Sequence, residues 1–263
     1  MLNDITLGQF YPINSIIHRL DPRIKIILTV LLVVFLFIAQ NFYSFLAIAC
    51  LCIAAVFISQ VPVRYMLKSF KPLIFIIIIT SLFNLFLTDG RILWQYGVFK
   101  ITYEGLNLAV FMVIRLLLLI TVTNLLTLTT SPILLTDGLE RLMSPLKKIK
   151  VPSHEIAMMM TIALRFIPTL LEETDKIIKA QSARGADFSS GNLLSRAKAM
   201  IPILIPLFIS AFRRADELAL AMECRCYSGG ENRTRMRQLK IKKADVLSLC
   251  ITILTGIAVL IIN

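Results

Sequence analysis

The chain has 263 residues, of which 57% are hydrophobic and only 17% are charged, and this excludes an ordinary soluble domain and indicates a polytopic membrane protein. In a soluble protein the net charge of +12 would suggest nucleic acid, but in a membrane protein the same excess is expected in cytoplasmic loops, so no nucleic-acid partner is predicted. The five scattered cysteines contain no CxxC pair and indicate no disulfide framework.

Residues 1–23 form a polar segment with several aromatic side chains. No short apolar core followed by a small-residue cleavage site is present, so no cleaved signal peptide is expected. Asp21 is a good N-cap and Pro22 a good first helical residue, because the cap oxygen accepts a free N–H and proline lacks the N–H that would go unpaired. A helix is therefore predicted to begin here and to cross the membrane through residues 24–39.

Four further apolar runs follow at residues 42–61, 72–88, 105–129 and 246–262. The five runs are 16 to 25 residues long, close to the roughly 20 residues that cross a bilayer core. Only Gln40 and Asn41 separate the first two runs, which predicts a tight helical hairpin. Trp94 and Tyr96 suit a loop at headgroup level in residues 89–104.

The sequence therefore predicts an all-α, polytopic membrane protein with about five transmembrane helices. Its expected parts are a cytoplasmic N-terminal segment, a first set of four transmembrane helices, a cytoplasmic or interfacial block of long helices, and a C-terminal transmembrane helix. In this order they occupy residues 1–23, 24–130, 131–243 and 244–263.

The distribution of Lys and Arg predicts the orientation. With the N-terminus inside, the cytoplasmic segments 1–23, 61–71 and 131–243 hold two, three and nineteen of them, and the outside segments hold none, two and none. Because cytoplasmic loops collect Lys and Arg, we expect a multi-pass protein of the cell membrane with the N-terminus in the cytoplasm and the C-terminus outside.

Two apolar runs inside the block, 156–171 and 199–212, are possible extra spans. Prolines interrupt both, and if both crossed, residues 172–198 with five Lys or Arg would lie outside. We instead expect long helices along the cytoplasmic interface, apolar on one side and charged at both ends. Residues 153–181 as one helix would extend roughly 40 Å.

Two predicted helices in the block end at an arginine beside small residues, in Ser182-Ala183-Arg184-Gly185 and Glu223-Cys224-Arg225-Cys226. Arginine offers five donors in a planar fork and stays charged, so at a helix end it can bind carboxylates or carbonyls of another protein. Gly185 fits the left-handed position just past a helix. The alternative is that these basic residues only complement the helix dipole and anionic membrane lipid.

The motifs of several function classes are missing. There is no G-x-x-x-x-G-K-[ST] loop for ATP, no metal-ligand spacing around His18 or His154, and no Asp or Glu within the five runs for a proton relay. Arg115 is the only ionised side chain in the middle of a run. It is a functional candidate, or else a structural residue bonded to helix carbonyls or to Asn84 or Asn124.

Three sequence pieces together resemble one known family, the transmembrane T components (EcfT) of energy-coupling factor transporters, over essentially the whole chain. They are Gly8-Gln9-Phe10-Tyr11-Pro12 with His18-Arg19-Leu20-Asp21-Pro22-Arg23-Ile24-Lys25, then Ala183-Arg184-Gly185, and Ala221-Met222-Glu223-Cys224-Arg225-Cys226-Tyr227. That family carries two Ala-Arg-Gly signatures at the ends of its coupling helices. Ala183, Arg184 and Gly185 match the first signature. Cys224 and Cys226 replace Ala and Gly around Arg225 in the second, which leaves the cap geometry after Arg225 open.

The resemblance implies a non-catalytic scaffold without a cofactor of its own. Two ATP-binding cassette ATPase subunits would bind ATP and each accept one arginine-bearing helix end. The long helices would hold an S component, possibly interchangeable, that imports a vitamin or metal ion. The Cys-Arg-Cys-Tyr form resembles the type shared by several S components. Two alternatives remain open: a stand-alone permease with its own substrate site, and a membrane-embedded enzyme.

Overall fold

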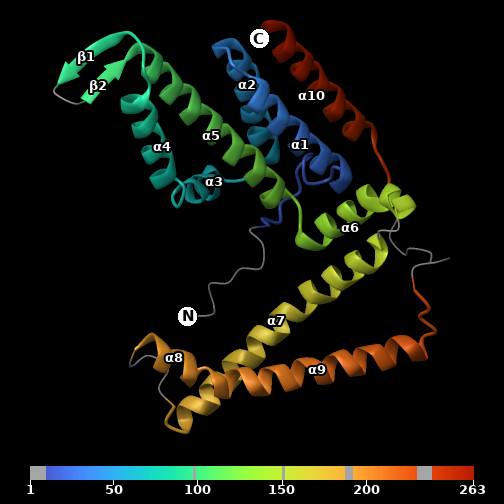
Figure 1. Cartoon of the computed structure of the whole chain (residues 1–263). Coiled ribbons are helices and arrows are strands. Elements are labelled where there is room, and N and C mark those ends of the chain that lie inside the picture. The colour runs from blue at the N-terminus through green and yellow to red at the C-terminus, as the bar shows by residue number, and fades with distance from the viewer. Residues whose placement is uncertain (1–9, 97–98, 150–151, 187–191, 230–238) are drawn as a thin grey trace. The chain divides into compact units, whose positions relative to one another are not determined.

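The computed structural model describes residues 10–96, 99–149, 152–186, 192–229 and 239–263 of the chain. These residues belong to two compact units (Figure 1). The first, called here the bundle unit, comprises Gly8–Leu142 and Gln238–Asn263, and the second, the helix-pair unit, is built from Met143–Arg237.

The bundle unit begins with the helix that the sequence predicts. Helix α1 (Pro22–Ile38) has Asp21 as its N-cap, and the Asp21 carboxylate accepts the backbone N–H of Arg23 at 3.0 Å. Helix α2 (Phe42–Ser59) starts after a three-residue link, so the predicted tight hairpin is confirmed. The start of α1 follows from local sequence, because a capping residue and proline act within one turn of the helix.

The middle of the bundle unit contains elements that the sequence analysis did not predict. A short helix, α3 (Val63–Phe70), precedes α4 (Ile74–Leu87), and strands β1 (Ile92–Tyr96) and β2 (Phe99–Thr102) form an antiparallel hairpin. The long helix α5 (Tyr103–Thr129) then leads into α6 (Pro132–Met143), and α10 (Lys243–Ile262) ends the chain. The hairpin lies where a headgroup-level loop is expected.

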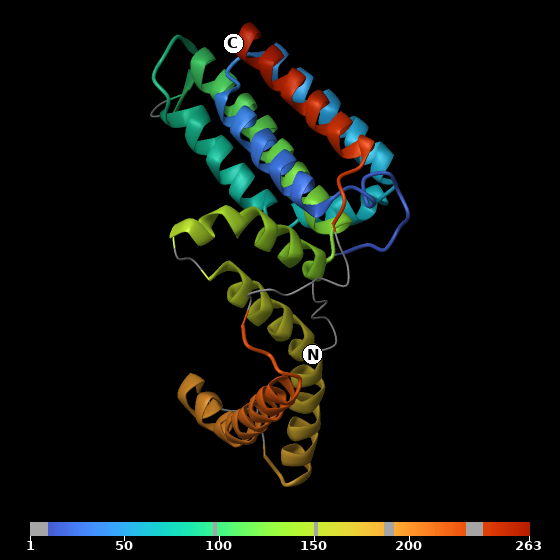
Figure 2. The ribbon, with the colours of Figure 1, turned by 90° about the vertical axis from the view of Figure 1, so that its right-hand side faces the viewer.

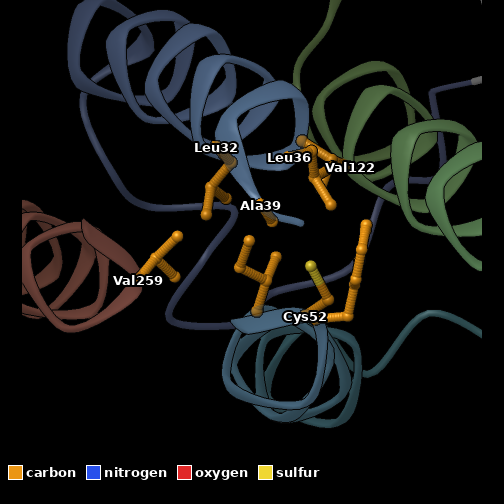
Figure 3. Packing of buried hydrophobic residues seen from close by; sticks show 8 residues of the cluster. Leu32, Leu36, Ala39, Cys52, Val122 and Val259 are labelled. Atoms are coloured by element: carbon orange, nitrogen blue, oxygen red, sulfur yellow. The ribbon is translucent and has the colours of Figure 1, made fainter. Parts of the chain in front are cut away.

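The bundle core lies between α1, α2, α5 and α10. Leu36, Phe45 and Ile48 are almost completely buried there, and Val259 of α10 closes one side (Figure 3). Phe45 stacks on Phe111 of α5 with ring centroids 5.6 Å apart. Large apolar side chains elsewhere on these helices stay exposed, as expected for helices that face lipid on their outer side.

Three of the segments expected on the cytoplasmic side meet at one end of the bundle. The backbone N–H of Tyr11 donates to Leu128 O at 3.0 Å, and the Tyr11 ring lies 4.8 Å from the Tyr65 ring. Lys25 Nζ donates to Thr129 O at 2.9 Å. The N-terminal segment, the segment before α4 and the C-terminal end of α5 therefore lie on the same side of the bundle.

The opposite end of the bundle joins the α1–α2 turn to the C-terminus. Asn41 Nδ2 donates to Ile262 O at 2.8 Å, and Asn263 Nδ2 donates to Ile38 O at 2.9 Å. Helices α1 and α10 therefore run parallel, from the end that carries Lys25 to the end that carries Asn263. This direction agrees with an odd number of crossings between them.

Length and composition allow four of the described helices, α2, α5, α7 and α10, to cross a membrane, and the pair α3 and α4, bent by 56°, is a fifth candidate as one broken span. Helix α1 has 17 residues, about 26 Å at 1.5 Å per residue. Helix α7, which the sequence analysis places along the interface, is the least apolar of the four. Its interfacial position stays a prediction.

The helix-pair unit contains the two long helices of the block. A short 3-10 helix, η1 (Ser144–Ile149), precedes α7 (Ser153–Ala183), and α8 (Leu193–Ala199) precedes α9 (Ile201–Cys224). Helix α7 continues through Pro168 for 31 residues, which confirms the single long helix expected here. Figures 1 and 2 show α9 crossing α7 rather than lying along it.

Candidate functional site at two arginine-capped helix ends

The C-terminal end of α7 has a complete set of capping hydrogen bonds. Arg184 is the C-cap, and Gly185 follows with φ +88°, the left-handed conformation expected from the sequence. The backbone N–H of Gly185 donates to Ser182 O at 3.0 Å, and that of Ala186 donates to Gln181 O at 3.0 Å. These two bonds define a Schellman motif, which satisfies carbonyls that the helix itself leaves free.

The C-terminal end of α9 has the same motif, although its residues differ. Arg225 is the C-cap, and Cys226 follows with φ +57°. The backbone N–H of Cys226 donates to Glu223 O at 2.8 Å, and that of Tyr227 donates to Met222 O at 3.0 Å. The cap geometry that the sequence left open after Arg225 is therefore that of the first end, with cysteine in the position of Gly185.

Both arginines are presented to solvent by nearly the same backbone. Arg184 has φ −84° and ψ 4°, and Arg225 has φ −94° and ψ 16°. Both side chains are exposed, as are the neighbours Ala183, Gly185, Cys224 and Cys226. The structure does not bring the two signatures together, because they end two helices that run in different directions (Figures 1 and 2).

An ion pair connects the two helices behind these ends. Arg214 Nη2 of α9 lies 2.7 Å from Glu173 Oε2 of α7, with both side chains partly exposed. Glu173 precedes Arg184 by 11 residues, and Arg214 precedes Arg225 by 11 residues. Each arginine therefore lies about 16 Å along its helix from the ion pair, at 1.5 Å per residue.

Arg115 has a structural environment inside the bundle unit. Its Nη2 donates to Ala39 O, the C-cap carbonyl of α1, at 2.7 Å, and its guanidinium lies 5.4 Å from the centre of the Phe45 ring. A cation is favoured both at a helix C-terminus and over an aromatic face. The structural interpretation with a helix carbonyl is thus supported, whereas Asn84 instead donates to Thr80 O.

Comparison with known proteins decides the family. The family model CbiQ, described as "Cobalt transport protein", matches residues 13–236. Proteins named "Energy-coupling factor transporter transmembrane protein EcfT" match along nearly their whole length. The one from Ruminiclostridium cellulolyticum is 57% identical over 96% of this chain and 95% of its own. The one from Clostridium kluyveri is 53% identical over 99% of this chain and 97% of its own. The one from Bacillus subtilis is 49% identical over 91% of each chain.

The chain belongs to the EcfT family. It is accordingly a multi-pass membrane component of an energy-coupling factor transporter, a multi-subunit complex. The predicted all-α membrane architecture is confirmed.

The EcfT-like N-terminal motif contributes a buried polar cluster that the sequence analysis missed. Asp245, at the start of α10, is 0% exposed and accepts the backbone N–H of Asp21 at 2.7 Å. Lys25 is 6% exposed and donates to the carbonyl of Thr129 at the end of α5. Burial works to raise the pKa of Asp21, but hydrogen bonds from Arg23 outweigh this and hold that pKa below its usual value. Both Lys25 and Asp245 lie at the edge of an apolar run, and this position was the sequence feature that could have indicated a buried polar contact.

The cluster shows none of the features of a metal centre. Within the described ranges, no three His, Cys, Asp or Glu side chains gather as metal ligands would. The two ring nitrogens of His18 bond within the N-terminal segment: Nδ1 lies 2.7 Å from Ser15 Oγ, and Nε2 donates to Tyr11 O at 3.0 Å. Burial lowers the pKa of His18 below its usual value. The polar groups at this end of the EcfT-family bundle thus connect helices to one another.

Cys226→Gly is expected to stabilise the last turn of α9. A non-glycine residue in the left-handed region destabilises the fold by about 1–2 kcal/mol. Glycine removes this strain, but its greater conformational entropy in the unfolded state cancels about 0.5–1 kcal/mol of the gain. The free energy of opening, measured by amide hydrogen exchange in this turn, should therefore rise by about 0.5–1 kcal/mol. Cys224→Gly is the control, because Cys224 is helical and glycine there should lower the same quantity. Equal losses in both variants would contradict the assigned strain.

Proposed function

We propose that this chain is the scaffold and coupling subunit of an ATP-driven importer of a vitamin or another micronutrient such as a metal ion. The chain is itself non-catalytic and holds no cofactor, and two ATP-binding cassette ATPase subunits in the cytoplasm bind ATP. Each ATPase accepts one arginine-capped helix end. A separate S component, interchangeable in the shared form of such transporters, binds the solute. The N-terminus is cytoplasmic and the C-terminus is outside.

One observation carries this proposal: two helices end in the same Schellman motif with an exposed arginine as the C-cap. Two copies of one surface feature on a single chain suit two partners that resemble each other, as two ATPase subunits do. The exposed guanidinium forks of Arg184 and Arg225 can bind carboxylates or exposed carbonyls in each partner. The site residues on this proposal are Ala183, Arg184, Gly185, Cys224, Arg225 and Cys226.

The apolar face of α9 supports a membrane partner between the two ends. Its N-terminal half exposes large side chains spaced three and four residues apart, which form one stripe along the helix. They are Ile201, Leu204, Ile205, Phe208, Ile209 and Phe212. A stripe of this size marks a surface that contacts lipid or another protein. On the proposal it holds the S component and lies against membrane lipid.

The interior of the bundle unit disfavours the stand-alone permease. A cavity of about 390 Å³ lies between α1, α2, α5 and α10. Its lining is apolar, and the hydroxyls that line it donate to carbonyls of their own helices: Thr29, Thr121, Thr129, Ser248 and Thr252. The three Nζ donors of Lys25 go to His18 O, Thr129 O and Thr130 Oγ1. The described lining therefore leaves no convergent polar groups for a vitamin or an ion.

Purification from native membranes tests the proposal. The tagged chain is extracted in mild detergent, and its companions are identified by mass spectrometry beside an untagged strain. We expect two ATPase subunits together with small membrane proteins, several of them if the chain serves several S components. The recovered complex is then placed in vesicles and offered a panel of radiolabelled water-soluble vitamins and Co²⁺, and the solute that it takes up serves as the probe for every variant.

Isolation of the chain alone would contradict the proposal if that preparation still bound or transported a solute of the panel. That result would identify a self-sufficient permease. ATP hydrolysis by the purified single chain would equally contradict it, since the chain is expected to bind ATP only through its partners.

A further inference from the structure

The N-terminal corner of α1, consisting of Asp21, Pro22 and Arg23, lies at the centre of the polar cluster of the bundle unit. Asp21 is 5% exposed and caps α1. The Arg23 side chain donates to both carboxylate oxygens of Asp21, from Nε to Oδ1 at 3.0 Å and from Nη2 to Oδ2 at 2.8 Å. The Asp21 backbone N–H is bound by the buried Asp245 at 2.7 Å. This corner is thus fixed by backbone, side-chain and interhelix hydrogen bonds together.

The segment between the helix-pair unit and α10 is hydrogen-bonded to this corner through residues 239 and 242. Arg23 Nη2 donates to Leu239 O at 3.3 Å. The backbone N–H of Lys242 donates to the second carboxylate oxygen of Asp245 at 2.6 Å. Asp245 therefore joins the last residue before α10 to the first residue of the corner, and Arg23 binds the chain three residues earlier.

The segment that leads toward the helix-pair unit meets the same corner. Helix α6 places Gly138 so close to α1 that a Cβ there would lie 3.0 Å from Pro22 Cβ and 3.3 Å from the backbone nitrogen of Arg23. Arg141, one turn later, adds a positive charge that favours the charged form of Asp21. Two connections between the units, before residue 143 and after residue 237, are therefore held at one place in the bundle unit.

We infer that this corner is the fixed joint through which movement of α7 and α9 reaches the transmembrane bundle, with Arg23 and Gly138 as its positioning residues. The inference rests on the proposed coupling function. A movement is transmitted through a connection only when the connecting segments have a defined position, because loosely held segments open locally and absorb the displacement. Here the leading and the returning segments share one set of buried contacts.

The test uses the intact transporter in vesicles, with the panel solute that the wild-type complex takes up as the probe. Arg23→Ala removes the bonds to both Asp21 and Leu239, and Gly138→Ala forces α6 away from Pro22 by a few tenths of an ångström. In each variant, solute uptake per ATP hydrolysed should fall by about fivefold or more, since coupling free energies are typically 1–3 kcal/mol. ATP hydrolysis itself should stay within about twofold of wild type, because the ATPase-binding ends are untouched.

Arg19→Ala is the matched control, since Arg19 is an exposed arginine four residues before Arg23 and should leave uptake per ATP unchanged. Arg23→Lys retains a donor for Asp21 and should recover part of the loss. Size-exclusion chromatography checks that each complex stays assembled. Wild-type uptake per ATP in both corner variants would overturn the inference, as would a proportional fall of uptake and hydrolysis. Arg184→Glu with Arg225→Glu is run in parallel, and wild-type uptake there would overturn the coupling function itself.

Discussion

Replacing Arg184 and Arg225 together by glutamate is expected to abolish ATP-driven uptake. Each reversal sets a negative charge against a docking surface that is selected for a guanidinium, and losing such a charge pair costs about 2 kcal/mol or more. Two independent losses of that size lower the affinity for the ATPase pair about a thousandfold. Both side chains are exposed and their caps rest on backbone hydrogen bonds, so the fold of the helix-pair unit should persist. Uptake of the panel solute into vesicles and copurification of the ATPases measure the effect.

Lys176→Glu with Arg213→Glu provides the matched control for this experiment. It makes the same charge change on the same two helices, at exposed positions away from the helix ends. Uptake and ATPase copurification should remain close to wild type. If the control pair lost as much uptake as the Arg184 and Arg225 pair, net charge rather than the capped ends would be responsible, and the assignment of the ends as docking sites would fail.

Asp245→Ala is expected to destabilise the bundle unit by about 2–4 kcal/mol, because one buried and one partly buried backbone N–H group lose their acceptor, at about 1–3 kcal/mol for the buried group and less for the other. These groups belong to Asp21 and Lys242. In thermal unfolding in detergent, the midpoint should fall by at least about 4 °C, because each kcal/mol lowers it by about 2–4 °C. Asp245→Asn should lose less, since its amide oxygen still accepts one of the two N–H groups.

Asp89→Ala is the control for stability, because Asp89 is an exposed aspartate in the same unit. Its unfolding midpoint should stay within about 1 °C of wild type, as is usual for surface substitutions. An Asp245→Ala midpoint indistinguishable from that of Asp89→Ala would show that the two N–H groups find other acceptors, and the cluster would then not hold α1 and α10 together.

Features with a strong local signal could be predicted from the sequence. The start of α1 depends on Asp21 and Pro22, which act within one turn, and the α1–α2 hairpin depends on a link too short for any alternative. Helix α3 and the β hairpin could not be predicted in this way. Each is short, and such elements are fixed by packing on α5 and α4 rather than by an apolar period of their own.

In the candidate site, too, only the features with a local sequence signal could be predicted. Glycine at position 185 predicted a left-handed cap because glycine adopts that conformation without steric cost. Cysteine at position 226 has no such preference, so only the structure shows that the same cap hydrogen bonds form there. The partner of Arg115 was equally out of reach, because Ala39 lies 76 residues away and the contact depends on how α1 and α5 pack.

The equal spacing of the two arginines from the Glu173–Arg214 ion pair has a mechanical consequence. Measured from that pair, α7 and α9 are levers with arms of the same length, about 16 Å each. If each tip binds one of two similar ATPase subunits, as proposed above, equal arms would convert equal displacements of the tips into a scissor-like rotation, with no net pull toward one partner. On that proposal the chain, although a single asymmetric polypeptide, would offer nearly the same lever to each of the two subunits.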